Sequence, residues 1–401
     1  MRARPAVLAA ILLTLGVVPA LGQTAAELFD QNAVQEIRLS VNTRDLALLR
    51  QNYQANTYYP ADLAWKNLKV RNVGIRSRGQ GSRNPTKIGL RVDMARYTTN
   101  QTFVGLSTII LDNIWQDDSM LREKLAFTMF EKMGIAVPRE SFCRLYINNQ
   151  YQGLYAITEE IDGDFVKHVT GQTDGTVFEF HWLADRQFRA EDLAAIAAYK
   201  PLFEPRTHVL DADSTLYNPI VNLFKEANGP DDAVWLSRVG EYLDLEAFVK
   251  QVAIEMFVVE NDGVLGYAGM NNFYLYRDQG TTRHRLFAWD KDQAFLSPAR
   301  EAPIRVTSDN VLFNRAMSYP DLRVIFLTAL EDCARIAATD DFLLLEIDRL
   351  VGLIFDAVRS DPRKQFPEPE RWDQAVKELR AFARERPAFV VDAVARIRGG
   401  Q

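Results

Sequence analysis

Apolar and polar residues alternate in three runs between about residues 33 and 110, and a period of two is typical of half-buried strands. The runs are VQEIRLSV from Val34, NLKVRNVGIRSRG from Asn67 and TKIGLRVDM from Thr86. Between the first two, TRDLALLRQNY has the pattern of a short helix, with Thr43 as its predicted N-cap. This part of the chain is therefore predicted to be rich in strands.

The pattern changes to a helical period at Asp118, in the run DSMLREKLAFTMFEKMG, and Gly134 is a suitable helix end. Two further strands, SFCRLYIN and GLYAITEEI, are predicted around a polar turn at residues 148–152. After them, TVFEFHWL has the pattern of a strand and DLAAIAAYK that of a helix. Residues 201–218 are predicted to be mostly loop.

The C-terminal half is mainly helical in its pattern. LDLEAFVKQVAIEMFVVEND, from Leu243, predicts a strong amphipathic helix, and NNFYLYRD and RHRLFAWD predict another strand pair. Beyond about residue 311 nearly every segment has a helical period, interrupted once by prolines at 362, 367 and 369. The order from strands to helices predicts an α+β protein, without a secure domain boundary.

The first 22 residues have the pattern of a secretory signal peptide. A basic start, MRAR, precedes the uncharged apolar run AVLAAILLTLGVV and the small residues of PALG. The apolar run is shorter than the roughly 20 residues that a transmembrane helix needs. We therefore expect a secreted, periplasmic or cell-surface protein without an integral membrane segment after signal cleavage.

Composition narrows the class of protein. The chain has 401 residues, 47% of them hydrophobic, with a formal net charge of −6. This acidic balance argues against a general nucleic-acid binder, which would carry a basic surplus. The two cysteines, Cys143 and Cys333, are too few for a disulfide scaffold, and whether they pair is left open by the sequence.

Acidic and amide side chains gather between residues 260 and 292. Asp262 follows the predicted amphipathic helix, Asn272 precedes a strand, and Asp290 and Asp292 follow the next strand. Oxygen ligands at the ends of separate elements are what Mg²⁺ needs in phosphoryl-transfer sites. The alternative is that these residues are ordinary turn or cap residues.

A second candidate site is the basic, glycine-rich turn in RSRGQGSRNPTKIGLRV. Arg76, Arg78, Arg83 and Lys87 surround this turn, whose backbone N–H groups and cations are suited to phosphate oxygens. The turn matches neither GxxxxGK[ST] nor GxGxxG, the standard nucleotide motifs. The alternative is a solvated basic hairpin at the edge of a sheet.

From about residue 30 to 395 the chain resembles the CotH kinase family, secreted spore-coat-type protein kinases with an atypical kinase-like fold. The resemblance rests on an ordered set of motifs: IRSRGQGSRNPTKIGLRV, DNIWQDDSMLREKLAFTMFEKMGIAVP, RLYINNQYQGLYAITEEID, ENDG, NNFYLYRD, FAWDKDQAF and FARERPAFV. It implies a bilobal fold, with a strand-rich N-terminal lobe over about 30–165 and a mostly helical C-terminal lobe over about 166–395.

The resemblance also implies roles for the basic and glutamate motifs. Lys87 matches a lysine taken to contact nucleotide phosphates, although Thr86 and the Ile88-Gly89 pair depart from the usual residues. Glu159 matches a glutamate expected to pair with that lysine or with the metal. Arg78 and Arg83 match the basic turn, and Arg122 matches a further arginine position.

The acidic motifs complete the implied site. Asp262 matches the proposed catalytic-loop acid, and Asn272 matches a metal ligand. Asp290 or Asp292 matches the metal-binding aspartate, and the motif does not distinguish between them. The site would hold Mg²⁺ or Mn²⁺ with ATP as co-substrate.

The implied activity is transfer of the ATP γ-phosphate to a Ser/Thr-type hydroxyl of a protein outside the cytoplasm. Two alternatives remain open. The first is a non-catalytic kinase-like module for binding or coat assembly, which the altered PTKIG context favours. The second is a metal-dependent extracytoplasmic hydrolase that uses the same carboxylates. No motif indicates a zinc site, a serine-hydrolase site or a nucleic-acid partner.

Overall fold

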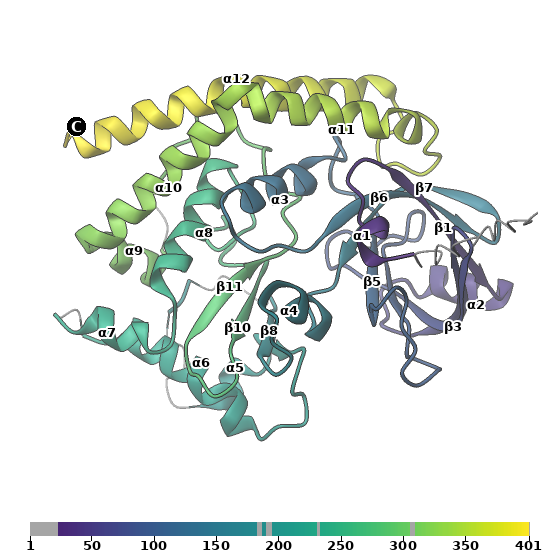
Figure 1. Ribbon diagram of the computed structural model, residues 1–401, viewed down its shortest axis with the longest axis horizontal. Coiled ribbons are helices and arrows are strands. Elements are labelled where there is room, and N and C mark those ends of the chain that lie inside the picture. The colour runs from purple at the N-terminus through teal and green to yellow at the C-terminus, as the bar shows by residue number, and fades with distance from the viewer. Residues whose placement is uncertain (1–22, 183–186, 190–194, 231–232, 305–308, 401) are drawn as a thin grey trace, which may run out of the picture.

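The computed structural model describes residues 23–182, 187–189, 195–230, 233–304 and 309–400 (Figure 1). The predicted signal peptide, residues 1–22, lies outside the described residues. Within them the chain is a mixed α+β protein, with a strand-rich N-terminal region followed by a mostly helical C-terminal region. This confirms the predicted fold class at that level.

Seven strands of the N-terminal region close into a barrel, in the order β1-β2-β3-β4-β5-β7-β6. Their bounds are β1 Val34–Val41, β2 Tyr59–Trp65, β3 Leu68–Ser77, β4 Leu90–Asp93, β5 Thr108–Asp112, β6 Glu140–Ile147 and β7 Gln150–Glu159. Neighbours are antiparallel except β1 and β6, whose parallel pairing closes the barrel. Closure removes the free sheet edges that an open sheet would expose.

Local sequence explains several boundaries in this region. Asn148 and Asn149 both have positive φ (50° and 63°), so the β6–β7 turn is tighter than the predicted 148–152. Helix α3, Arg122–Lys132, ends before Gly134, which has φ 74°. Helix α2, Thr43–Gln51, is capped by the side chain of Asn42, so the prediction of Thr43 as N-cap is wrong by one residue.

A second, antiparallel sheet has the order β11-β10-β8-β9. Its strands are β8 Thr176–Phe180, β9 Phe203–Pro205, β10 Phe273–Arg277 and β11 His284–Ala288. The remaining α-helices are α1 Ala25–Leu28, α4 Gly163–Thr170, α5 Ile196–Tyr199, α6 Asp213–Ala227, α7 Trp235–Gly240, α8 Leu245–Phe257, α9 Val311–Ser318, α10 Pro320–Ala338, α11 Phe342–Arg359 and α12 Pro369–Arg398. The loop prediction for 201–218 is wrong from Asp213 onward, where α6 begins.

The hydrophobic core has separate parts in the two regions. One cluster fills the barrel and contains Cys143, whereas the largest cluster surrounds α8 and α10 and contains Cys333. Both cysteines are buried free thiols. No helix among the described residues is both long and apolar enough to cross a membrane.

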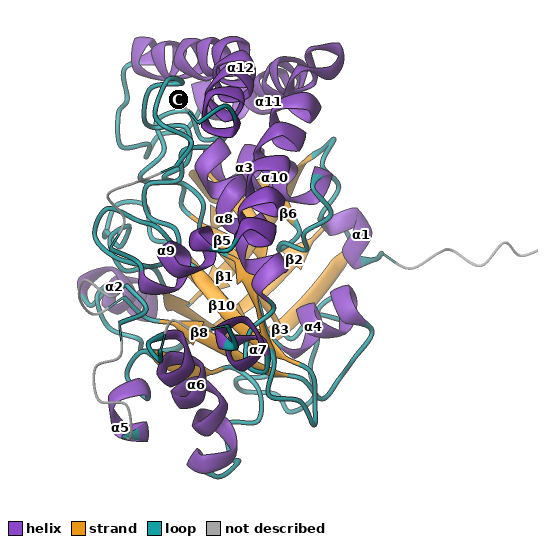
Figure 2. Ribbon diagram, turned by 90° about the vertical axis from the view of Figure 1, so that its left-hand side faces the viewer, coloured by secondary structure: helices purple, strands orange, loops and turns teal. Residues whose placement is uncertain are grey.

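The last two long helices connect the regions. Figure 1 shows α11 and α12 running along one side of the molecule, from the helical region across to the barrel. Figure 2 shows the strands in the middle, with α11 and α12 above them and α5 and α6 below. Tyr151 in β7 donates a hydrogen bond to the carbonyl of Ala357 in α11 (3.2 Å). The C-terminal helices therefore hold the barrel against the rest of the protein.

The buried His284 in β11 is expected to make the folded protein less stable in acid. Its Nδ1 lies 2.9 Å from the carbonyl of Tyr242, and burial lowers the pKa of the imidazole to about 4. Because the folded pKa lies below the unfolded value, this stability is present above about pH 6.5 and is lost as pH falls toward 4. We expect wild type to lose about 2 kcal/mol more than His284→Asn between about pH 7.5 and 4.5 in urea unfolding. Equal losses in both proteins would contradict this assignment.

Candidate functional site

A cleft of about 910 Å³ lies where the barrel faces the second sheet and the end of α8. The barrel side of the cleft is basic, with arginines from β3, the following loop and β4. The opposite side carries carboxylates and amides from the segments around β8, β10 and β11. The cleft brings together these residues predicted from the sequence: Arg78, Arg83, Asp262, Asn272, Asp290 and Asp292.

Asp262 is held in the turn that follows α8. Val259 has φ 54°, so the chain reverses directly after the helix, and the Asp262 N–H donates to Glu260 Oε1 (2.7 Å). The amides of Asn271 and Asn272 donate to Asp262 Oδ2 at 3.1 and 3.0 Å. Burial raises the pKa of Asp262, and these two hydrogen bonds oppose the rise. The carboxylate therefore has a fixed orientation at the cleft surface.

Asp290 and Asp292 follow β11 and line the cleft, while Lys291 between them does not. Asp290 has φ 49°, and Lys291 is fully buried, with Nζ 2.9 Å from Glu255 Oε1. Burial raises the pKa of Asp290 to about 6, although Arg78 opposes the rise. Burial and the neighbouring Asp290 raise the pKa of Asp292 well above its ordinary value. Both aspartates therefore lie where the charged form of a carboxyl is disfavoured unless a cation is present.

Glu123 is a third acidic residue beside these aspartates, and it was not predicted from the sequence. It lies in the first turn of α3, and its Oε1 accepts from the N–H of Lys291 (3.4 Å). Burial raises the pKa of Glu123 well above its ordinary value, and Glu140 and Asp290 raise it further. Glu123 directly follows Arg122 in the SMLREK motif, and this adjacency was the available signal.

Of the three basic-wall arginines on β3 and the loop after it, one is paired with a carboxylate and two bind neutral groups. Arg78 Nη1 lies 2.6 Å from Asp112 Oδ2, and its guanidinium lies 5.4 Å from the centre of the Trp289 ring. Arg76 and Arg83 both donate to Asn56 Oδ1, at 3.2 and 2.6 Å. The pKa of Arg83 is lowered by burial and then by Arg76 and Arg78. This part of the wall is therefore suited to an anion.

Gly79 shapes the loop that carries Arg83. It has φ 97°, and a Cβ there would lie 2.3 Å from Ser82 Oγ, so a side chain would strain this turn. The carbonyl of Gly79 accepts a hydrogen bond from Arg83 Nε (2.5 Å). The glycine-rich motif thus positions the arginine through its backbone.

Glu160 and its two arginine partners also line the cleft and were not predicted from the sequence. Glu160 follows β7 and accepts from Arg91 (3.1 Å) and Arg206 (2.6 Å). Burial alone would raise the pKa of Glu160, but Arg206 and Arg91 outweigh it and lower the pKa. This network ties β4 and the segment after β9 to one carboxylate.

Lys87 does not lie in the cleft, so its predicted contact with nucleotide phosphates is not supported by its position. Its side chain is fully buried, and Nζ lies 2.8 Å from Asp361 Oδ2, beyond the end of α11. The ammonium lies 5.2 Å from the centre of the Tyr155 ring. Burial lowers the pKa of Lys87, and Asp361 opposes this. Lys87 joins the barrel to the C-terminal helices.

Glu159 is also outside the cleft and is not paired with Lys87. Its Oε1 lies 2.5 Å from Arg139 Nη2, and its Oε2 lies 3.5 Å from His168 Nδ1. Burial would raise the pKa of Glu159, but the bonds from His168 and Arg139 lower it. Glu159 and Glu160 are neighbours at the end of β7, but only Glu160 lines the cleft.

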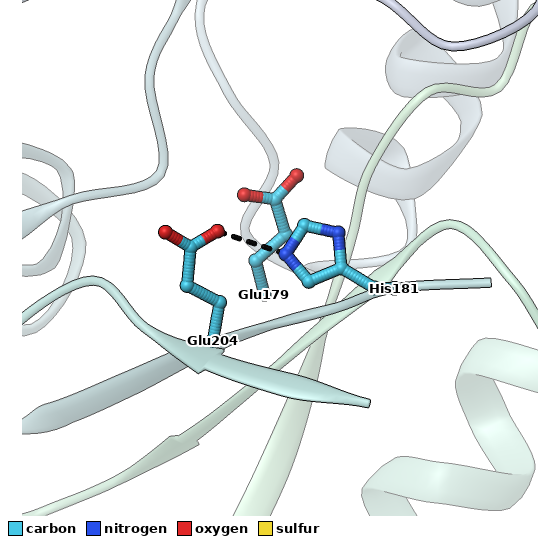
Figure 3. A group of neighbouring side chains, drawn as sticks. All are labelled: Glu179, His181 and Glu204. Carbon is cyan, nitrogen blue, oxygen red and sulfur yellow. Dashed lines mark hydrogen bonds and ion pairs between the residues drawn. The ribbon is translucent and has the colours of Figure 1, made fainter. Parts of the chain in front are cut away.

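Glu179, His181 and Glu204 form a group whose ligand atoms lie within 4.8 Å of one another (Figure 3). Glu179 and Glu204 are paired residues of β8 and β9, and His181 Nε2 lies 2.8 Å from Glu204 Oε2. Arg206 Nη1 lies 3.2 Å from Glu179 and 3.7 Å from Glu204. The Arg206 guanidinium is thus already close to both carboxylates of this group. Asp290 and Asp292, predicted as metal ligands, are not part of it.

Comparison with known proteins agrees with the motifs that line this cleft. Over residues 75–390 the chain matches the family model described as CotH kinase protein. It is similar to the inner spore coat protein H of Bacillus subtilis (strain 168), with 22% identity over 375 residues. That alignment covers 90% of this chain and 98% of the relative. The chain belongs to the CotH kinase protein family.

Proposed function

We propose that the protein is an exported phosphotransferase that moves the γ-phosphate of ATP to a Ser/Thr-type hydroxyl of a protein. The observation that carries this proposal is the cleft, in which an arginine wall faces a set of poorly solvated carboxylates. Phosphoryl transfer depends on positioning and on charge stabilisation, and these two walls supply both.

The arginine wall is suited to the triphosphate. Arg76 and Arg83 bind neutral oxygens on the protein, so both guanidiniums keep their charge for an anion. Arg78 is shared with Asp112 and lies deeper, close enough to Asp290 to influence its pKa. Arginine forks match phosphate oxygens well. In this scheme Arg78 and Arg83 are cofactor-binding residues, as the resemblance implies, and Arg76 joins them.

The opposite wall fits a divalent cation. Burial raises the pKa of Asp290 and of Asp292, and neighbouring carboxylates raise both further. A bound cation would stabilise the charged form of both groups. Asp290, Asp292 and the Oδ1 atom of Asn272 would hold Mg²⁺ or Mn²⁺, which prefer such oxygen ligands. When bound, the metal neutralises charge on the phosphate oxygens.

Asp262 is the proposed catalytic residue. Asn271 and Asn272 hold one carboxylate oxygen, and the carboxylate is thereby oriented to accept a hydrogen bond from an acceptor hydroxyl. As general base it would orient that hydroxyl and take its proton as the phosphate is transferred. No activated protein nucleophile is needed in this scheme.

The proposed fold and location extend what the family membership establishes. The barrel region and the helical region would correspond to the two lobes of an atypical kinase, with the cleft between them. The relative is described as an inner spore coat protein, and the signal-peptide pattern of residues 1–22 agrees with export. The acceptor would therefore be a secreted, surface or coat protein.

A second candidate function is binding without turnover, as a kinase-like assembly module. One observation favours it: Lys87, the lysine that the resemblance assigns to the phosphates, is buried against Asp361 outside the cleft. The two candidates share the nucleotide site and differ in the transfer step.

Transfer of phosphate from radiolabelled ATP distinguishes the two candidate functions. We expect the purified protein to transfer ³²P from [γ-³²P]ATP to itself or to a serine-rich test protein when MgCl₂ or MnCl₂ is present. EDTA should abolish transfer, because the carboxylate wall then lacks its cation. Metal-dependent ATP binding without any ³²P transfer would favour the assembly module. Release of free phosphate or sugar from a polymer without ATP would favour a hydrolase.

A further inference from the structure

Arg386 in α12 is a fully buried arginine that binds four backbone carbonyls. Its Nη2 and Nε donate to the carbonyls of Met256 and Phe257, at 2.6 and 2.9 Å. Its Nη1 donates to the carbonyl of Ala299 (2.9 Å) and to that of Glu301. One side chain from the C-terminal helix thus joins two segments that are distant in sequence.

The first segment is the end of α8, which leads into the turn that holds Asp262. The last carbonyls of a helix have no partner within the helix, and a cation near them also interacts favourably with the helix dipole. Arg386 is such a cation, and it also donates hydrogen bonds to the carbonyls of Met256 and Phe257. The next carbonyl, of Val258, accepts a hydrogen bond from the N–H of Phe295 (2.8 Å). The start of the Asp262 turn is therefore fixed from outside the helix.

The second segment continues from the other acidic residues of the cleft. Residues 295–301 follow Asp292, and the Phe295 ring packs edge-to-face on Phe382 of α12, with centroids 5.0 Å apart. Ser297 Oγ lies 3.1 Å from Asn261 Nδ2, next to Asp262. The two acidic segments of the cleft therefore touch each other and share one anchor in α12.

We propose that Arg386 is a positioning residue that sets the placement of Asp262 relative to Asp290 and Asp292. This inference rests on the proposed function, in which Asp262 orients the acceptor and the other two aspartates hold the metal. The guanidinium spans both segments because its five N–H donors lie in a rigid plane. A lysine carries the same charge but has one nitrogen, which cannot reach all four carbonyls.

Kinetics of Arg386→Lys test the proposal, with Arg380→Lys as the matched control. Arg380 lies on the same helix, and its Nε is 2.7 Å from Asp348 at the protein surface. We expect Arg386→Lys to lower kcat by about 10–100-fold with KM for ATP changed by less than about threefold, because small misplacements of reacting groups are costly. Arg380→Lys should behave as wild type. Equal kcat values in all three proteins would overturn the proposal.

Hydrogen–deuterium exchange gives a readout that does not depend on activity. Arg386→Lys should raise amide exchange in both segments, 256–263 and 293–302, without changing exchange in β6 and β7 of the barrel. Unchanged exchange in either segment would overturn the proposal. If wild type transfers no phosphate, the proposed function fails, and this exchange result still decides the role of Arg386. If Arg386→Lys does not fold, Phe389→Leu removes one aromatic ring beside the guanidinium (5.7 Å) and is judged by the same exchange pattern.

Discussion

Asp262→Asn is expected to lower the rate of phosphoryl transfer by about 10²–10⁴-fold, the usual effect of removing a general base. Binding of ATP with Mg²⁺ should change little, because Asn keeps the size of the side chain and Asp262 orients the acceptor. The Asn271 and Asn272 amides can still donate to the Oδ1 atom of the new amide. Single-turnover transfer rates and calorimetric ATP affinities, measured on the same preparations, check both parts.

Asp290→Asn and Asp292→Asn are expected to differ from Asp262→Asn in their effect on ATP binding. At least one of them should abolish metal-dependent ATP binding and transfer together, because the cation carries most of the neutralisation of the triphosphate. Asp278→Asn, in the turn after β10, changes an exposed aspartate away from the cleft and serves as control. If Asp262→Asn binds metal and ATP as poorly as the metal-site variant, then Asp262 is a ligand and the roles proposed above are wrong.

Lys87→Met is expected to lower the free energy of unfolding by about 3–5 kcal/mol, the cost of leaving one member of a buried ion pair without its partner. Asp361 Oδ2 accepts from Lys87 Nζ (2.8 Å) and from the N–H of Leu154 (2.9 Å), so its charge would stay buried. Lys87→Met/Asp361→Asn should regain part of the loss, because no unpaired charge then remains. Urea unfolding of the single and double variants measures both effects.

Lys200→Met is the matched control for this prediction. Lys200 is also paired with an aspartate, Asp213, at 2.9 Å, but both side chains are about half exposed. Water screens an exposed ion pair, so the loss of unfolding free energy in Lys200→Met should be much smaller than in Lys87→Met. A loss of ATP affinity in a stably folded Lys87→Met protein would instead support the phosphate contact that the family resemblance implies.

Periodic segments were predictable because their physical signal is local. The alternation in VQEIRLSV becomes β1 at the same residues, Val34–Val41, and the long amphipathic pattern contains α8. Closure of the barrel was not predictable, because it rests on the parallel pairing of β1 with β6 about a hundred residues later. Helix α6 was missed because Pro219 lies inside it and the preceding residues favour turns.

The site residues also divide into those with a local sequence signal and those that depend on distant parts of the chain. Asp262, Asn272, Asp290 and Asp292 were found because side chains near strand and helix ends suit a cation, and they do line one cleft. Lys87 was misplaced because its partner, Asp361, lies 274 residues away and no local pattern indicates it. The chemical roles of the four cleft residues stay predictions.

The buried pair of Lys87 and Asp361 also has a consequence for how the chain matures. The ammonium belongs to the barrel, but its counter-ion is supplied by residues that are synthesised much later. Until Asp361 is in place, Lys87 has no counter-ion, and an uncompensated cation is strongly unfavourable in a buried position. In a chain that emerges N-terminus first, this ion pair therefore forms only after Asp361, just beyond α11, has been synthesised. Nascent chains shortened before Asp361 should accumulate as unfinished, protease-sensitive forms.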